Sequence, residues 1–111
     1  MIRDFDIAFE TDNRAEALRL ANALEADLRE ATDVSISRKK DRSDSQDFGS
    51  TLVLVFGTPV AIVLAKAISN FLQRNTGATI RITEAGEVLA SNLDSRDAAR
   101  IAEALAGKRS K

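Results

Sequence analysis

The chain has 111 residues, a length that suits one domain with a single hydrophobic core. Hydrophobic residues make up 44% and charged residues 30%, which is typical of a globular protein and excludes a disordered one. The 16 basic and 17 acidic residues give a net charge of −1, and this balance argues against nucleic acid as a partner, because phosphate binding needs a basic excess.

The sequence contains no cysteine and no histidine. Disulfides, cysteine nucleophiles, Ser-His-Asp triads and metal sites built on these residues are therefore excluded. Glycine-rich phosphate-binding motifs are absent as well. We therefore expect a protein that is not an enzyme and holds no cofactor and no metal. The N-terminus does not have the pattern of a signal peptide, so we expect a cytoplasmic protein.

Residues 2–9 alternate between apolar and polar side chains, which predicts a half-buried strand. Asn13 is a good N-cap residue, and we expect a helix from there to about Ala31. Val34 and Ile36 indicate a second short strand. The apolar positions of the helix recur with helical spacing, at Ala17, Leu20, Ala21, Leu24 and Leu28.

Residues 38–47 contain seven charges and no apolar side chain, which predicts a surface loop. Asp41, Asp44 and Asp47 within it are carboxylates of the kind that bind hard cations. Basic neighbours neutralise them, and the glycine and bidentate glutamate of a calcium loop are missing. We therefore expect no metal there.

The run from Leu52 to Leu72 is the most apolar part of the chain, and residues 52–65 carry no charge. Thr58 and Pro59 form a helix-start signature, so we expect a helix over residues 59–74. Residues 49–56 fit either a buried strand or a preceding helical turn, because a short apolar run has no periodicity that separates the two.

After Gly77 the pattern returns to the alternation of strands. Two strands, around residues 79–83 and 88–90, are joined by a turn over residues 84–87. Asp94 or Ser95 is expected to cap a last helix. The predicted order is β-α-β-(α)-α-β-β-α, which makes residues 1–111 a single α+β domain with a small four-stranded sheet and about three helices.

The polar residues of the expected helix over 59–74 form one stripe, made by Lys66, Ser69, Asn70 and Gln73. Extending this stripe toward the N-terminus reaches Ile62, where a solvent-facing position should be polar. The first half of the helix is therefore apolar on all sides, which favours burial on all sides.

Three interpretations of this segment stay open. It is a central core helix, an interface with a partner or a second copy, or a membrane segment. A continuous helix from Leu52 to Leu72 would reach about 31 Å at 1.5 Å per residue, enough to cross a bilayer core, but Pro59 and Lys66 interrupt it. For the interface, the residues expected to meet the partner are Leu52, Val55, Phe56 and Ile62.

Two segments, GSTLVLVFGTPVAIVLAKAISNFLQRN (49–75) and ATIRITEAGEVLASNLDSRDAARIAEAL (78–105), resemble the effector-associated constant component family of bacterial conflict systems. The family pattern is an apolar helical segment broken by small residues, then a stretch like A-x-x-L-x-x-x-L-x-x-W-L, a short hairpin and a final helix. Thr58 and Pro59 replace the small residues usual at the break. The second part is matched by Ala61, Leu64, Ile68, Phe71 and Leu72.

The resemblance implies a small non-enzymatic partner of variable effectors, often peptidases or NTPase regulators, and provides no active-site residues. We therefore expect an adaptor or regulatory component that binds an effector protein, or itself, through residues 52–72. The alternative is a small membrane-active effector that inserts the same segment.

Overall fold

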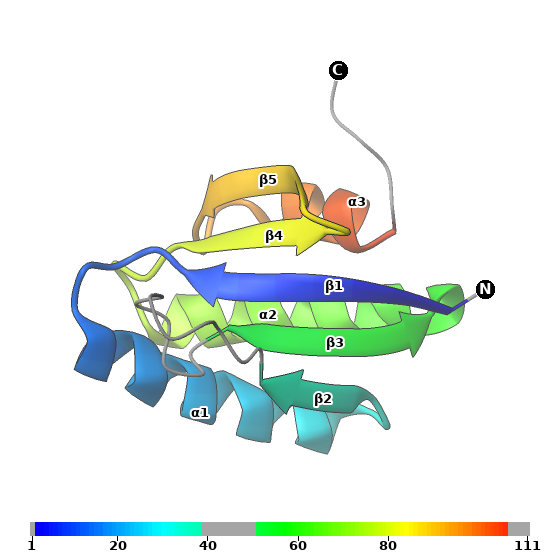
Figure 1. The fold of residues 1–111 in the computed structure, drawn as a ribbon, viewed down its shortest axis with the longest axis horizontal. Coiled ribbons are helices and arrows are strands. Elements are labelled where there is room, and N and C mark those ends of the chain that lie inside the picture. Colours follow the sequence, from blue (N-terminus) through cyan, green and yellow to red (C-terminus); the bar gives the residue numbers. More distant parts are fainter. Residues whose placement is uncertain (1, 39–50, 107–111) are drawn as a thin grey trace.

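The computed structural model describes residues 2–38 and 51–106. Five strands and three helices follow one another along these residues (Figure 1). In chain order they are β1 (Ile2–Phe9), α1 (Arg14–Ala31), β2 (Ser35–Arg38), β3 (Leu52–Gly57), a 3₁₀ turn (Thr58–Val60), α2 (Ala61–Arg74), β4 (Ile80–Glu84), β5 (Glu87–Leu93) and α3 (Ala98–Leu105).

The five strands form one antiparallel sheet in the order β2-β3-β1-β4-β5, with β1 in the middle (Figure 1). Because β3 and β4 both run antiparallel to β1, these two strands are parallel to each other. Helix α2 connects β3 to β4, and β1 lies between them in the sheet. In the same way α1 connects β1 and β2 across β3. The elements from β1 to β4 thus follow the split βαβ, or ferredoxin-like, arrangement, and β5 and α3 extend it.

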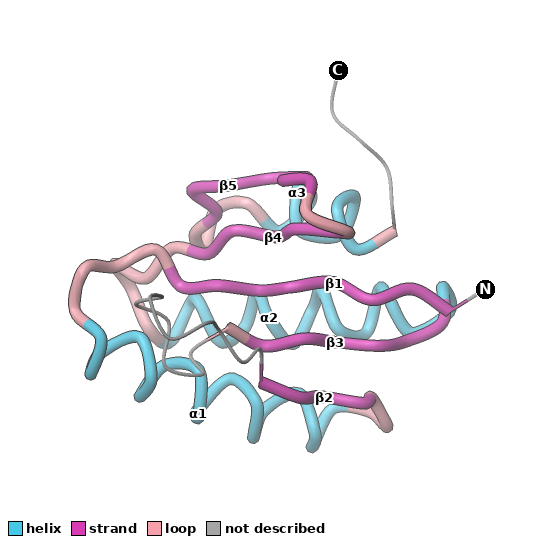
Figure 2. Tube along the Cα trace, in the orientation of Figure 1, coloured by secondary structure: helices cyan, strands magenta, loops and turns pink. Residues whose placement is uncertain are grey.

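The three helices form one layer on one face of the sheet, with α2 between α1 and α3 (Figure 2). Alternate residues of each central strand point into this layer and are buried, as the period of a strand requires. The ring of Phe5 stacks on that of Phe56 at 5.2 Å, and Phe9 packs against Phe71 at 5.9 Å between ring centroids. The largest fully buried side chains are Phe5, Phe71, Ile7, Leu24, Leu28, Leu52, Leu54, Leu64, Ile68, Leu72, Ile80 and Ile82.

The predicted first helix is confirmed, with the buried residues of α1 at the five positions that the spacing indicated. The side chain of Asn13 accepts a hydrogen bond from the Glu16 backbone N–H at 3.0 Å, which caps the helix. The Glu16 carboxylate does not complete a capping box. It accepts hydrogen bonds from Arg19, and the Asn13 N–H donates to Thr11 Oγ1.

The prediction of four strands is wrong, because residues 52–57 form a fifth strand, β3. The apolar run Leu52–Leu72 is therefore divided between a strand and a helix and is not one continuous helix. Among the helices within the described residues, none combines the length and apolar character that crossing a membrane requires.

The last helix also begins later than predicted. Residues 94–97 form a turn in which the Asp97 N–H donates to the Asp94 carbonyl at 3.0 Å, and α3 starts only at Ala98. The predicted hairpin turn over residues 84–87 is confirmed. Most of the charged run 38–47, including its three aspartates, lies outside the described residues.

Candidate functional site

Two adjacent apolar side chains on the first turn of α2 are exposed. Ile62 is 74% exposed and Val63 is 43% exposed. Only two other large apolar residues of the described chain are exposed, Leu18 at 38% and Val88 at 53%, and they lie on α1 and β5. We call Ile62 and Val63 the α2 patch.

The sequence of α2 explains why these two residues point outward. One side of the helix faces the sheet, and its buried residues are Ala61, Leu64, Ala65, Ile68, Ser69, Phe71 and Leu72. The opposite side carries Lys66, Asn70 and Gln73, all exposed, and it reaches Ile62 one turn before Lys66. The helix therefore has a solvent face along its whole length, and only its first turn is apolar there.

This placement corrects two expectations from the sequence. The N-terminal half of the helix is not buried on all sides, because Ile62 is 74% exposed. Ser69 does not belong to the solvent-facing stripe, since it is 6% exposed and lies on the sheet side.

The structure does not bring the four predicted interaction residues together. Leu52 and Phe56 are 0% and 5% exposed, and they belong to the core beneath the helices. Val55 is half-buried and points to the other face of the sheet, because strand residues alternate. Of the four, Ile62 is the residue exposed on the helical layer. Val63 is its neighbour in the patch and was not among the predicted interaction residues.

The outer edge of β2 is covered by charged side chains. Arg29 of α1 donates a hydrogen bond to the carbonyl oxygen of Ile36 in β2 at 3.2 Å. Arg38, at the end of β2, bonds Glu25 and Asn22 at 2.9 and 2.6 Å. The hydrogen bonds from Arg29, followed by those from Arg38, keep the pKa of Glu25 below its ordinary value. Such contacts oppose the addition of another strand at this edge.

The other edge strand, β5, is irregular. Its register against β4 shifts twice, between Ile80 and Ile82 and between Ile82 and Thr83. Asn92 has a positive φ of 56° and donates its N–H to Glu10 Oε1 at 2.8 Å. Bulges of this kind twist a strand and shorten the straight edge that a partner strand can pair with. Both edges of the sheet are therefore poorly suited to docking.

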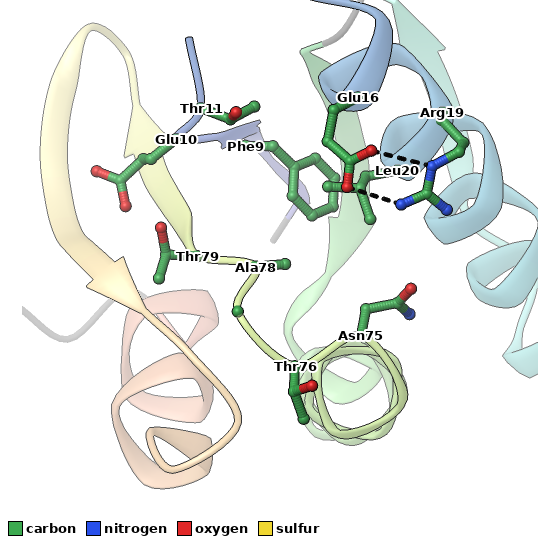
Figure 3. A pocket seen from close by; sticks show the side chains of 11 residues that line it. Phe9, Glu10, Thr11, Glu16, Arg19, Leu20, Asn75, Thr76, Ala78 and Thr79 are labelled. Carbon is green, nitrogen blue, oxygen red and sulfur yellow. Dashed lines mark hydrogen bonds and ion pairs between the residues drawn. The ribbon is translucent and has the colours of Figure 1, made fainter. Parts of the chain in front are cut away.

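A cavity of about 310 Å³ lies where the end of β1, the first turns of α1 and the α2–β4 loop meet (Figure 3). Its apolar floor includes Phe9 and Leu20, and the Glu16–Arg19 ion pair crosses one side of it (Figure 3). The hydrogen bonds from Arg19 lower the pKa of Glu16, while Glu10 accepts the hydrogen bond from Asn92. The charged groups of this cavity therefore already have partners within the protein.

The described residues contain no group of three or more acidic side chains that could hold a metal ion. A second, more open hollow lies between α1 and α2, and the Asp27–Arg74 ion pair crosses it. The α2 patch is thus the candidate functional site. Comparisons of the chain with protein-family models, with curated proteins and with solved structures gave no match.

Proposed function

We propose that this chain is a non-enzymatic adaptor or regulatory component of a bacterial conflict system, and that it acts by binding another protein chain through the α2 patch. The exposure of Ile62, 74% on a helix whose other side forms the middle of the core, is the observation that carries this proposal. Single exposed apolar residues are common on protein surfaces. Two adjacent ones on a rigid helix form a better anchor for a partner.

The composition of the chain supports a role without catalysis. Nucleophilic and acid–base catalysis rely most often on histidine, cysteine or a serine activated by histidine, and the chain has no histidine or cysteine. In the cavity at the end of β1, Glu16 and Arg19 are hydrogen-bonded to each other. The family resemblance of residues 49–75 and 78–105 supports the same assignment.

The proposed partner is an effector protein, and the proposed location is the cytoplasm. The balance of 16 basic and 17 acidic residues supports a protein partner over nucleic acid. The irregular β5 and the covered edge of β2 favour the helical layer as the docking surface, since neither edge presents a long, straight row of pairing groups.

The test is co-expression of the tagged chain with the protein encoded by the adjacent gene, followed by quantitative co-purification. Ile62→Lys places a charge in the patch, and lysine is a good helix former, so the fold should be kept. Val88→Lys is the matched control, because Val88 is also apolar and more than half exposed but lies on β5. We expect Ile62→Lys to lower recovery of the partner about tenfold or more, as for a central anchor residue, and Val88→Lys to leave it unchanged.

Two results would contradict the proposal. One is that the neighbouring protein does not co-purify with the wild-type chain. The other is that Ile62→Lys and Val88→Lys retain the partner equally well while both variants melt like the wild type, which would place the contact away from α2.

A further inference from the structure

We propose that the occupant of the α2 patch is a second copy of this chain, and that Lys66 of one copy pairs with Glu103 of the other across a two-fold axis. The inference rests on the proposed function, since it uses the same patch, and it names the partner. An effector would then bind the assembled dimer, and Ile62→Lys would lower its recovery by breaking that dimer.

The first support is that α2 and α3 present one continuous outer surface. The two helices pack side by side on the same face of the sheet (Figure 2). Ile62 and Lys66 lie on the exposed side of α2, and Glu103 and Ala99 lie on the exposed side of α3. Each of these exposed sides lies opposite the side of its helix that is buried in the core.

The second support is the state of the charges on this surface. Most other charged residues of the helices are paired, as in Glu25–Arg29, Asp27–Arg74 and Asp97–Arg100, although Glu30 on α1 is exposed and makes no such contact within the described residues. Lys66 and Glu103 are exposed, and within the described part of the chain neither takes part in an ion pair or a hydrogen bond. One is basic and the other acidic, on neighbouring helices.

This pair of opposite charges favours a second copy over an unrelated chain. In a two-fold interface, any contact between residue i and residue j occurs twice. An axis through the outer surface of α2 and α3 brings Lys66 to the partner's Glu103, and Glu103 to the partner's Lys66, in one step. A partner surface of a single charge sign would satisfy one of these residues and repel the other.

The α2 patch supplies the apolar centre of the same interface. Ile62 is one helical turn from Lys66, so its side chain would be covered when the ion pairs form. The lysine hydrocarbon stem can cover apolar surface while its ammonium group reaches a carboxylate. Two apolar residues from each copy and two exposed ion pairs per dimer make a small interface, so we expect weak association, with a Kd on the order of 10–100 μM.

The experiment is sedimentation velocity on the purified full chain at concentrations from about 1 to 300 μM, which bracket that Kd. Four variants are compared with the wild type: Lys66→Glu, Glu103→Lys, the double charge exchange of both, and Ile62→Lys. Val88→Lys is the control. Thermal melting of each variant verifies that the fold is kept.

We expect the wild type and Val88→Lys to shift from monomer to dimer over this range. Each single charge reversal turns two attractions into two repulsions and should raise the Kd about tenfold or more. The double exchange restores both attractions and should return the Kd to within about threefold of the wild type, since double-mutant coupling isolates the pair. Ile62→Lys should abolish the dimer in this range.

A wild-type chain that stays monomeric at the highest concentration overturns the inference. The inference also fails if Lys66→Glu and Glu103→Lys leave the Kd of the dimer unchanged. It fails as well if the double charge exchange does not bring the Kd back toward the wild-type value. The proposed function fails by a different result, the loss of co-purification with the neighbouring protein. If the chain stays monomeric but still binds the protein encoded by the adjacent gene through Ile62, the inference of a second copy is wrong and the proposed adaptor function stands.

Discussion

Ile62 and Leu64 lie two positions apart on α2, and truncating each to alanine should change the stability of the fold by very different amounts. Leu64 is 0% exposed, so Leu64→Ala removes packed hydrocarbon from the core and should cost about 2–5 kcal/mol of unfolding free energy. Ile62 is 74% exposed. Both substitutions remove three carbon atoms, so the comparison isolates burial.

The expected cost of Ile62→Ala follows from its exposed fraction. Fully burying an isoleucine side chain is worth about 1.5–3 kcal/mol, so the one quarter of it that is buried contributes roughly 0.4–0.8 kcal/mol. Alanine is the better helix former, and this offsets a few tenths of a kcal/mol. The net change in unfolding free energy should lie within about 0.5 kcal/mol of zero.

Urea denaturation followed by far-ultraviolet circular dichroism measures both changes. At about 2 μM protein, well below the expected Kd, the result reports the monomer alone. At about 200 μM the wild type should gain stability from association, whereas Ile62→Ala should gain less. A loss of more than about 2 kcal/mol for Ile62→Ala at the low concentration would show that Ile62 is a core residue, and the partner surface would then have to be sought first on the charged run 38–47.

Three further predictions concern the rest of the fold. Asn13→Ala removes the oxygen that accepts the Glu16 N–H at 3.0 Å, and should lower the unfolding free energy by about 1 kcal/mol in urea titration; an unchanged midpoint would contradict this capping role. Ala85 has a positive φ of 55° in the β4–β5 turn, a conformation that asparagine tolerates better, so Ala85→Asn should raise the unfolding free energy by about 0.5–1 kcal/mol, and a lower melting temperature would refute the strain. The hydrogen bonds from Arg96 lower the pKa of Asp94 from 3.8 to about 2. The folded state therefore binds fewer protons than the unfolded state, and this contribution to stability is present above pH 3.8 and is lost as the pH falls to about 2, so the stability of Asp94→Asn should depend less on pH across this interval.

The parts of the fold that could be predicted are those with one apolar and one polar side. The strand at residues 2–9 and helix α1 have this character, and their buried positions were identified correctly. Strand β3 could not be recognised, because Val53 and Val55 on its other face are apolar as well. With both faces apolar, the alternation that distinguishes a strand from a helix disappears.

The same ambiguity affected the candidate site. Without knowing that residues 52–57 form a strand, the sequence could not show that Leu52 and Phe56 point into the core while Val55 points the other way. Ile62 was identifiable, since the polar stripe of its helix includes its position. Glu103 was not, because an exposed glutamate on a helix is ordinary until the structure shows which helix lies beside it.

The position of β3 between β1 and β2 has a consequence for the order in which the chain folds. No pairing between β1 and β2 exists in the sheet, so a ribosome that has released only residues 1–50 has produced strands that do not pair with each other. Until β3 is synthesised, β1 has no neighbouring strand with which to pair, and its apolar side is not covered by one. We expect this interval to be the time at which the nascent chain is most prone to aggregate, and the arrival of Leu52–Gly57 to end it.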